Sequence, residues 1–273
     1  MSAHTEIAWT DHTFNPWTGC TKISPACAHC YAEKSPGSVF RGVKWGPKAE
    51  RVVSADSTWR QPLAWNRKAK REGINRRVFC GSLCDVFEAR DDLDEHRARL
   101  WGLIEATPNL CWLLLSKRPE NVIDMVPRWW MPDIPSEVGG GWPANVWIGA
   151  TVEDQRRADE RIPYLLRIPA PVRFLSVEPL LGPVDLELHE IDIAMELGPW
   201  ENVQGRLDWV ITGSESGPHR RPTDLAWVRS LRNQCQVARV PFFCKQIPGP
   251  RGALRDMDDF PADLRIRQFQ EDR

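Results

Sequence analysis

The sequence predicts an α/β protein built on a partial parallel barrel of six or seven β/α units, of the TIM type. Three observations indicate this class: six short apolar segments recur along the chain, helical patterns separate several of them, and polar residues follow each one. The apolar segments are too short for helices and do not alternate, which is typical of strands buried on both faces of a parallel sheet. Regular strand–helix steps also fit a doubly wound sheet.

The predicted strands lie about 27 to 36 residues apart, the step of a β/α unit. A further strand is expected near EIAWTDHTF (6–14), which brings the number to six or seven. The six main segments are RVFCGSL (77–83), CWLLLS (111–116), VWIGATV (146–152), VRFLSV (172–177), DWVITG (208–213) and PFFCKQ (241–246).

Three helices are predicted between these strands, at 91–109, 153–168 and 223–240. The first opens with acidic residues and stops at Pro108, as the helix dipole and the geometry of proline favour. The second contains Pro163, which predicts a break or kink. The third follows Thr223, a suitable N-cap.

No linker or low-complexity segment divides the chain, so we expect a single domain over 1–273. Two segments interrupt the regular spacing, 128–145 and 185–206, and we interpret them as loop insertions. The N-terminal residues lack the basic and apolar regions of a signal peptide, and no apolar run approaches ~20 residues. We therefore expect a cytoplasmic protein, in which clustered cysteines bind metal or catalyse reactions more often than they form disulfides.

The net charge of −1 hides a basic segment, which extends from Lys34 to Arg77 and holds twelve Lys or Arg against three acids. Trp45, Trp59 and Trp65 are interspersed in it. Cations with aromatic residues are typical of a surface that binds a phosphate backbone, and a solvated helix face with a charged loop is the alternative. The candidate nucleic-acid residues are Arg67, Lys68, Lys70, Arg71, Arg76 and Arg77.

Cys20, Cys27 and Cys30 form a C-x6-C-x2-C pattern in the segment NPWTGCTKISPACAHCYAE (15–33). The C-x2-C spacing suits both zinc and iron–sulfur sites. A structural zinc site needs a fourth ligand, which His12 or His29 would supply. A [4Fe–4S] cluster on three thiolates keeps one iron open for substrate or cofactor. Three small buried cysteines without a metal are the remaining alternative.

Polar residues follow every predicted strand, in GSLCDVFE, SKRPEN, TVEDQ, SVEPLLGP, GSESGPHRRP and KQIPGP. In parallel β/α proteins the loops at the carboxyl ends of the strands build the site. These side chains are therefore expected around one shared cavity.

The cysteine segment together with GSLCDVFE, LLLSKRPEN, WIGATVED, RFLSVEPLLGPV, WVITGSESGPHRRP and FFCKQ closely resembles a phage- and prophage-associated protein family of unknown function. The three-cysteine motif places that family beside the radical S-adenosylmethionine (SAM) enzymes. The resemblance covers essentially the whole chain. The chain departs from the usual C-x3-C-x2-C pattern of radical SAM enzymes, because six residues separate Cys20 from Cys27 and His29 precedes the last cysteine.

The resemblance implies a radical SAM-like barrel in which Cys20, Cys27 and Cys30 ligate a [4Fe–4S] cluster. SAM on the open iron would yield a 5′-deoxyadenosyl radical, with electrons from a flavodoxin- or ferredoxin-like protein. The substrate is unknown, with a nucleic acid or nucleotide as one expectation. Lys117 or Arg118 would meet a carboxylate or phosphate, and the catalytic candidates are Cys84 as hydrogen donor and Lys245 at the substrate. The candidate cofactor-binding residues are Gly81, Ser82, Asp85, Ser116, Lys117, Glu153, Glu178, Ser214 and Glu215.

Two other functions remain open on the sequence. One is a zinc-stabilised nucleic-acid-binding protein without catalysis, and the other is a radical SAM enzyme that acts on a small metabolite or a peptide. Cys80, Cys111, Cys235 and Cys244 are interpreted as core residues.

Overall fold

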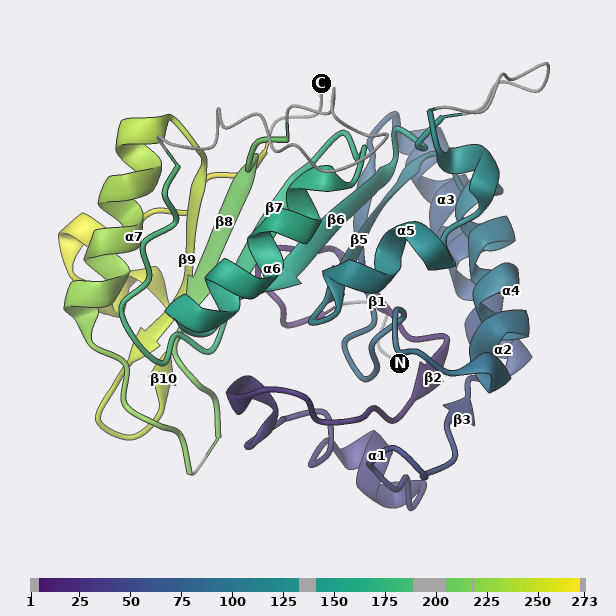
Figure 1. Ribbon diagram of the computed structural model, residues 1–273, viewed down its shortest axis with the longest axis horizontal. Coiled ribbons are helices and arrows are strands. Elements are labelled where there is room, and N and C mark those ends of the chain that lie inside the picture. The colour runs from purple at the N-terminus through teal and green to yellow at the C-terminus, as the bar shows by residue number, and fades with distance from the viewer. Residues whose placement is uncertain (1–4, 133–140, 189–204, 218, 271–273) are drawn as a thin grey trace. The chain divides into compact units, whose positions relative to one another are not determined.

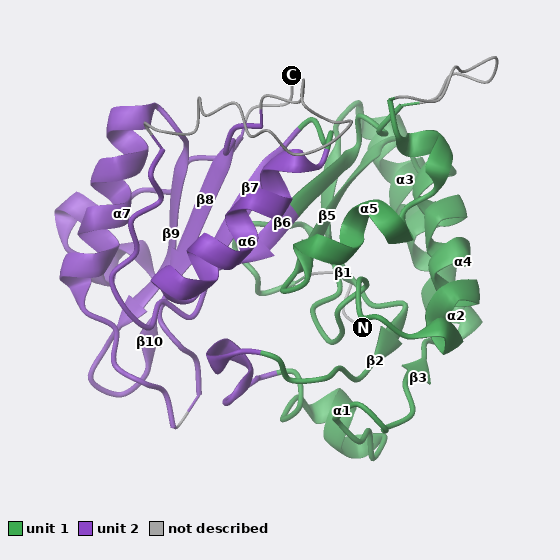
Figure 2. Cartoon of the chain, viewed as in Figure 1, with its two compact units in different colours: residues 1–23, 32–148, 169–171 green, residues 24–31, 149–168, 172–273 purple. Residues whose placement is uncertain are grey.

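The computed structural model describes residues 5–132, 141–188, 205–217 and 219–270. The chain forms two compact units (Figure 2). Unit 1 comprises 1–23, 32–148 and 169–171, and unit 2 comprises 24–31, 149–168 and 172–273. The cysteine segment is shared between them, since Cys20 belongs to unit 1 and both Cys27 and Cys30 belong to unit 2.

Unit 1 is built on parallel strands (Figure 1). β1 (His12–Phe14) pairs with β4 (Arg76–Cys80), which pairs in turn with β5 (Leu110–Ser116). β6 (Val146–Thr151) begins in this unit and ends in unit 2. In a small antiparallel pair, β2 (Trp17–Thr18), which precedes the basic segment in the sequence, pairs with β3 (Val52–Val53), which lies within that segment.

The helices of unit 1 follow from local sequence signals. α3 (Gln61–Glu72) has Pro62 in its first turn and ends at Gly73 in the left-handed conformation, as helix starts and stops favour. α4 (Asp94–Glu105) opens with acids and buries an apolar stripe. The shorter helices are α1 (Pro36–Phe40), α2 (Asp56–Trp59), η2 (Asp91–Leu93), η3 (Pro119–Asn121), α5 (Val122–Met125) and η4 (Arg128–Trp130).

Unit 2 continues the parallel pattern, with β7 (Arg173–Val177), β8 (Trp209–Gly213) and β9 (Phe242–Pro248) paired in that order. β10 (Ala253–Leu254) is antiparallel to β9. The register shifts between β8 and β9, because Thr212 pairs with Cys244 and Gly213 pairs with Gln246. Lys245 is therefore the extra residue of a β-bulge. The helical elements are η1 (Pro25–Cys27), α6 (Gln155–Arg167), α7 (Leu225–Ala238), η6 (Met257–Asp259) and η7 (Ala262–Leu264).

The α/β class, the mostly parallel sheet and all six main predicted strands are confirmed, and the early strand is β1. Their side chains are buried almost throughout, which explains the absence of alternation. The three predicted helices are α4, α6 and α7. α6 is not broken at Pro163 but continues through it. The predicted cap of α7 was wrong: Asp224 caps the helix and accepts the Ala226 N–H, while Thr223 bonds to Leu180.

Other organisational predictions are covered only in part by the described residues. The predicted insertions fall largely outside them, at 133–140 and 189–204. The single domain stays a prediction beside the two compact units. Among the described residues, no helix is long and apolar enough to cross a membrane.

Candidate metal and cofactor site

Cys20 lies against loops that follow the carboxyl ends of β4 and β5 in unit 1. The preceding Gly19 has φ +114° and donates its N–H to the Leu83 carbonyl (3.1 Å). A Cβ on Gly19 would lie 3.1 Å from the Arg51 side chain, so glycine permits this close approach. The Arg118 Nη1 donates to the Cys20 Sγ (3.8 Å). Cys20 is thereby positioned at the edge where parallel α/β proteins build sites.

Arg118 is held by the buried carboxylate of Asp85, which follows β4. One Asp85 oxygen accepts from Arg118 (2.8 Å) and from the Lys117 N–H (3.1 Å), and the other accepts the Ser116 hydroxyl (2.7 Å). The other end of the guanidinium donates to the Thr21 carbonyl (2.9 Å). Arg118 therefore connects two strand-end loops to the backbone beside Cys20.

The surroundings of Cys20 favour its protonated thiol in the metal-free chain. Burial raises the pKa of Cys20 to about 12, the carboxylate of Asp85 adds to the rise, and the Arg118 guanidinium opposes it.

A second buried ion pair fixes the segment next to Cys20. The Arg51 side chain is 1% exposed, and its Nε and Nη2 donate to both oxygens of Glu88 (2.9 and 2.6 Å). Its other N–H groups donate to the carbonyls of Gly46 and Ala49 and to the Thr21 hydroxyl. Gly46 donates in turn to the Cys20 carbonyl (3.1 Å). Arg51 thus organises the backbone on both sides of this contact.

In unit 2, Cys27 ends the short helix η1 and is anchored through Glu153. The Ala26 N–H donates to the Glu153 Oε1 (3.1 Å), and the Arg161 Nη1 donates to the Oε2 (2.9 Å). Glu153 is 0% exposed and follows the carboxyl end of β6. The Ser24 hydroxyl lies 3.8 Å from the Cys27 Sγ.

A second anchor of this segment is Glu215, which follows β8. Its Oε2 lies 3.1 Å from the His29 Nδ1 and accepts the Arg221 N–H (2.7 Å), and both oxygens bond to the Arg221 guanidinium. Burial opposes ionisation, but the bonds from Arg221 and His29 outweigh it and hold the pKa of Glu215 below its usual range. A charged carboxylate therefore orients the ring of His29.

Glu178, which follows β7, and Lys245 form a pair across Gly213, the last residue of β8. Lys245 lies within β9 and not at its end, because the strand continues to Pro248. The Lys245 Nζ lies 2.7 Å from the Glu178 Oε1. A Cβ on Gly213 would lie 2.6 Å from that same oxygen, so only glycine leaves room for it. The β-bulge at Lys245 directs its side chain toward Glu178. The buried hydroxyls of Thr212 on β8 and of Ser214, the residue after β8, have no hydrogen-bond partner within the described ranges.

The remaining candidates near Cys20 have structural contacts. Gly81 has φ 93°, and Ser82 accepts from Asn15 (2.9 Å). Burial raises the pKa of Cys84 well above its ordinary value. Within the described residues, no group of three His, Cys, Asp or Glu side chains is arranged to hold a metal ion. The joint site of Cys20, Cys27 and Cys30 stays a prediction. Cys80, Cys111, Cys235 and Cys244 are buried, as core residues.

The candidate nucleic-acid residues lie away from Cys20. Asn66 of α3 accepts the N–H of Asn109, the residue before β5, which places the C-terminal half of α3 at the amino ends of the strands. Trp59 is buried and Trp65 stacks on His12 (ring centroids 4.3 Å apart), so these rings are occupied. Arg67, Lys68, Lys70 and Arg71 are exposed, while Arg76 and Arg77 are half-buried beside Asp11.

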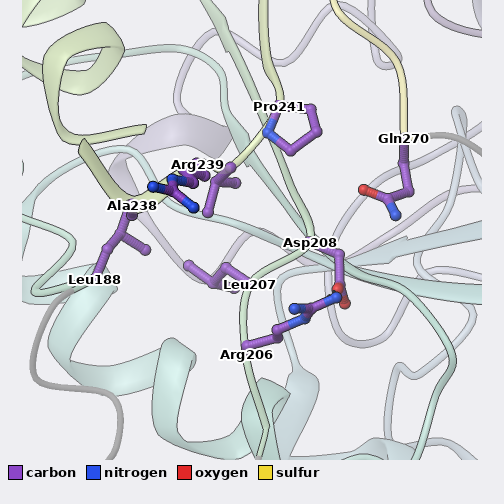
Figure 3. Close-up of a pocket in the computed structure, with 9 residues that line it drawn as sticks. Leu188, Arg206, Leu207, Asp208, Ala238, Arg239, Pro241 and Gln270 are labelled. Atoms are coloured by element: carbon purple, nitrogen blue, oxygen red, sulfur yellow. The ribbon is translucent and has the colours of Figure 1, made fainter. Parts of the chain in front are cut away.

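A cavity of about 240 Å³ lies at the other edge of unit 2 (Figure 3). Most of its lining comes from the segments before β8 and β9, at their amino ends, and Leu188 and Gln270 complete it, so it shares no residue with the contacts described above. The lining residues are Leu188, Arg206, Leu207, Asp208, Ala238, Arg239, Val240, Pro241 and Gln270.

Sequence reasoning missed the arginines that fix the carboxylates after the strands. Arg51 and Arg161 are buried and Arg221 is partly exposed, and each pairs with an acid in a loop that follows a strand. No local pattern distinguishes them from the other arginines of the chain, because these pairings depend on the tertiary fold.

Comparisons with known proteins identify a family and a set of similar structures. The family described as "Protein of unknown function (DUF5131)" matches residues 4–257. No curated protein matches the chain. A spore photoproduct lyase with a Cys-to-Ser substitution is similar with a TM-score of 0.47 and 14% identity, covering 91% of this chain and 70% of that one. A variant of that enzyme with bound AdoMet and dinucleoside spore photoproduct gives 0.44 and 13%, with the same coverage.

Proposed function

This chain belongs to the DUF5131 family, and we propose that it is a radical SAM enzyme in which Cys20, Cys27 and Cys30 hold a [4Fe–4S] cluster. One observation carries the proposal. In each unit separately, the cysteine segment is hydrogen-bonded to side chains that follow the carboxyl ends of parallel strands: Arg118 for Cys20 and both Glu153 and Glu215 for the segment of Cys27 and Cys30. Cofactor sites of parallel α/β proteins are built at this edge.

The donor set suits an iron–sulfur cluster. Three thiols are present, and the Cys20 sulfur already receives an N–H from Arg118. Hydrogen bonds to ligating sulfurs raise the reduction potential of such clusters and hold the ligands in place. Arg118 is therefore proposed to orient Cys20 and to compensate the negative charge of its thiolate.

When bound, the cluster would supply one electron from a flavodoxin- or ferredoxin-like protein to SAM, which then provides a hydrogen-abstracting 5′-deoxyadenosyl group. The chain's own part is to bind and orient. Lys245 on β9 and Glu178 after β7 offer one charge of each sign. The buried Thr212 and Ser214 hydroxyls would form hydrogen bonds with the bound cofactor, as donors or as acceptors. The proposal includes the curling of the parallel strands into a partial barrel around these groups.

A zinc-stabilised nucleic-acid-binding protein is the second candidate, and the contact between His29 and Glu215 favours it. A carboxylate on the Nδ1 leaves the Nε2 of His29 as a fourth ligand beside three thiolates. Zinc-binding histidines commonly carry such a carboxylate partner.

Release of 5′-deoxyadenosine tests the proposed reaction. Anaerobically reconstituted protein, incubated with SAM and dithionite, is expected to form 5′-deoxyadenosine, and Cys27→Ala is expected to reduce it to background. Cys235→Ala removes a buried thiol on α7 and serves as the matched control, with product formation retained. Intact SAM in the presence of a fully loaded, reduced cluster would contradict the proposal.

A further inference from the structure

The first part of the basic segment, Lys34 to Lys48, presents cations without acids. Lys34, Arg41, Lys44 and Lys48 are all exposed, and the segment contains no Asp or Glu. Arg41 donates to the neutral Gly37 carbonyl and Thr18 hydroxyl, and none of the three lysines pairs with an acid in the described chain. The nearest acids in sequence flank the segment: Glu33, which pairs with Lys22, and Glu50. The segment therefore carries four positive charges without internal compensation.

Phe40 lies among these cations and is the most exposed large apolar side chain described, at 92%. Val39 beside it is 67% exposed. Hydrogen bonds hold α1 on both sides of Phe40. Ser35 caps its first turn and the buried Ser38 hydroxyl donates to the Ala32 carbonyl (2.6 Å), while the Val43 N–H after the helix donates to the Ser38 carbonyl (3.0 Å). The exposed ring of Phe40 therefore lies on a hydrogen-bonded backbone.

This segment lies directly beside Cys20. Gly46 donates to the Cys20 carbonyl, and Arg41 donates to Thr18 (2.6 Å). A Cβ on Gly19 would lie 3.5 Å from the Val43 side chain. The buried Arg51 binds the carbonyls of Gly46 and Ala49. A ligand on the cations of this segment would consequently lie next to a candidate cluster ligand.

The other cationic cluster, on α3, lies at the opposite strand ends. Figure 1 shows α1 and α3 at opposite ends of unit 1. On α3, Lys68 lies beside Glu72, which also pairs with Arg76. The two clusters thus contain four cations each but differ in their position relative to Cys20 and in the presence of an exposed aromatic ring.

We propose that the segment Lys34–Lys48 binds single-stranded nucleic acid, with phosphates on Lys34, Arg41, Lys44 and Lys48 and a base stacked on Phe40. Cations that follow a backbone, combined with an aromatic ring that is free to stack, are the features by which proteins bind single strands without reading sequence. This inference assigns a substrate class to the proposed function. The binding of a strand does not depend on the proposed reaction, but the strand's role as substrate does.

Two variants with four changes each provide a matched test. One replaces Lys34, Arg41, Lys44 and Lys48 by glutamine, and the other replaces Arg67, Lys68, Lys70 and Arg71. Binding of fluorescent single-stranded DNA and RNA 12-mers is measured between 50 and 200 mM salt. The first variant is expected to bind at least tenfold more weakly, with a salt slope smaller by up to about 0.7 per lost phosphate contact. The second is expected to stay within about threefold of the wild type.

Phe40→Ala tests the stacking separately from charge. It is expected to weaken binding roughly tenfold with an unchanged salt slope, because stacking on an aromatic ring is not a counterion-release effect. Val237→Ala, at an apolar position on α7 that is 81% exposed, is the control and is expected to bind as the wild type does. Circular dichroism of every variant establishes that the fold is retained.

Four results would overturn the inference. The first is loss of binding in the α3 variant instead of the Lys34–Lys48 variant, and the second is duplex binding as tight as single-strand binding with no effect of Phe40→Ala. The third is binding to vesicles of anionic lipid that depends equally on the same four cations, and the fourth is absence of strand binding at 50 mM salt. Iron content and 5′-deoxyadenosine are measured on the same preparations. If the protein holds the cluster and cleaves SAM but binds neither single-stranded DNA nor single-stranded RNA, only the proposed nucleic-acid surface is refuted. Strand binding by a protein that holds only zinc refutes the proposed reaction alone.

Discussion

Replacing Arg51 by leucine is expected to lower the free energy of unfolding by about 3–5 kcal/mol, the usual loss when one partner of a buried ion pair is removed. Glu88 would remain buried as an unpaired carboxylate, and the Gly46 and Ala49 carbonyls would lose their donor. Because Gly46 bonds to the Cys20 backbone, iron binding is expected to weaken as well. Urea unfolding followed by tryptophan fluorescence measures the first effect, and iron per chain measures the second.

The control for Arg51→Leu is Lys68→Leu, which also removes one cation from an ion pair in unit 1. Lys68 is exposed on α3 and lies 3.8 Å from Glu72, so its removal is expected to leave the unfolding midpoint unchanged. Arg51→Lys keeps the charge but not the planar geometry of the guanidinium, and its unfolding midpoint is expected to lie between those of Arg51→Leu and Lys68→Leu. Equal midpoints for Arg51→Leu and the wild type would show that the pair does not organise unit 1.

Replacing Glu153 by leucine is expected to lower the free energy of unfolding by a similar ~3–5 kcal/mol in unit 2. The substitution leaves the Arg161 guanidinium buried without a counter-charge and the Ala26 N–H without an acceptor. The segment of Cys27 would thereby lose its bond to the end of β6. Urea unfolding and iron content are again the measurements.

A second substitution distinguishes charge from packing at this position. Replacing both Glu153 and Arg161 by leucine removes the uncompensated charge and is expected to recover much of the lost stability, but not the anchor of Ala26. Iron binding should therefore stay weak while the unfolding midpoint recovers. Arg156→Leu, in the exposed pair with Glu160 on the same helix, is the control with an unchanged midpoint. Recovery of iron binding in the double variant would refute the anchoring role of Glu153.

The strands were predictable because burial on both faces leaves a direct mark on the sequence. CWLLLS (111–116) reads as a central strand and forms β5, whose residues are almost entirely buried. α3 was predicted only as an alternative, a solvated helix face in the basic segment, because only Pro62 and Ala69 of it are buried and its charges obscure any apolar stripe. Helices that contribute so little to the core leave no periodic pattern to read.

The positions of the candidate carboxylates in their own units were predictable, but their contacts were not. Asp85 follows β4 in unit 1, and Glu153 and Glu215 follow β6 and β8 in unit 2, as the polar residues after each strand indicated. Their pairing with arginines was not predictable, since Arg118 is 33 residues from Asp85 in the sequence. A carboxylate at a strand end is equally compatible with a cofactor contact and with an internal ion pair, and only the fold distinguishes them.

Metal and sulfide analysis of anaerobically purified and reconstituted protein tests the central claim most directly. We expect about four irons and four sulfides per chain. They should be lost in Cys20→Ala, Cys27→Ala and Cys30→Ala and retained in Cys235→Ala, whose thiol is buried in α7. One tightly bound zinc without iron, dependent on His29, would contradict the radical SAM assignment and make the cysteine segment a structural zinc site.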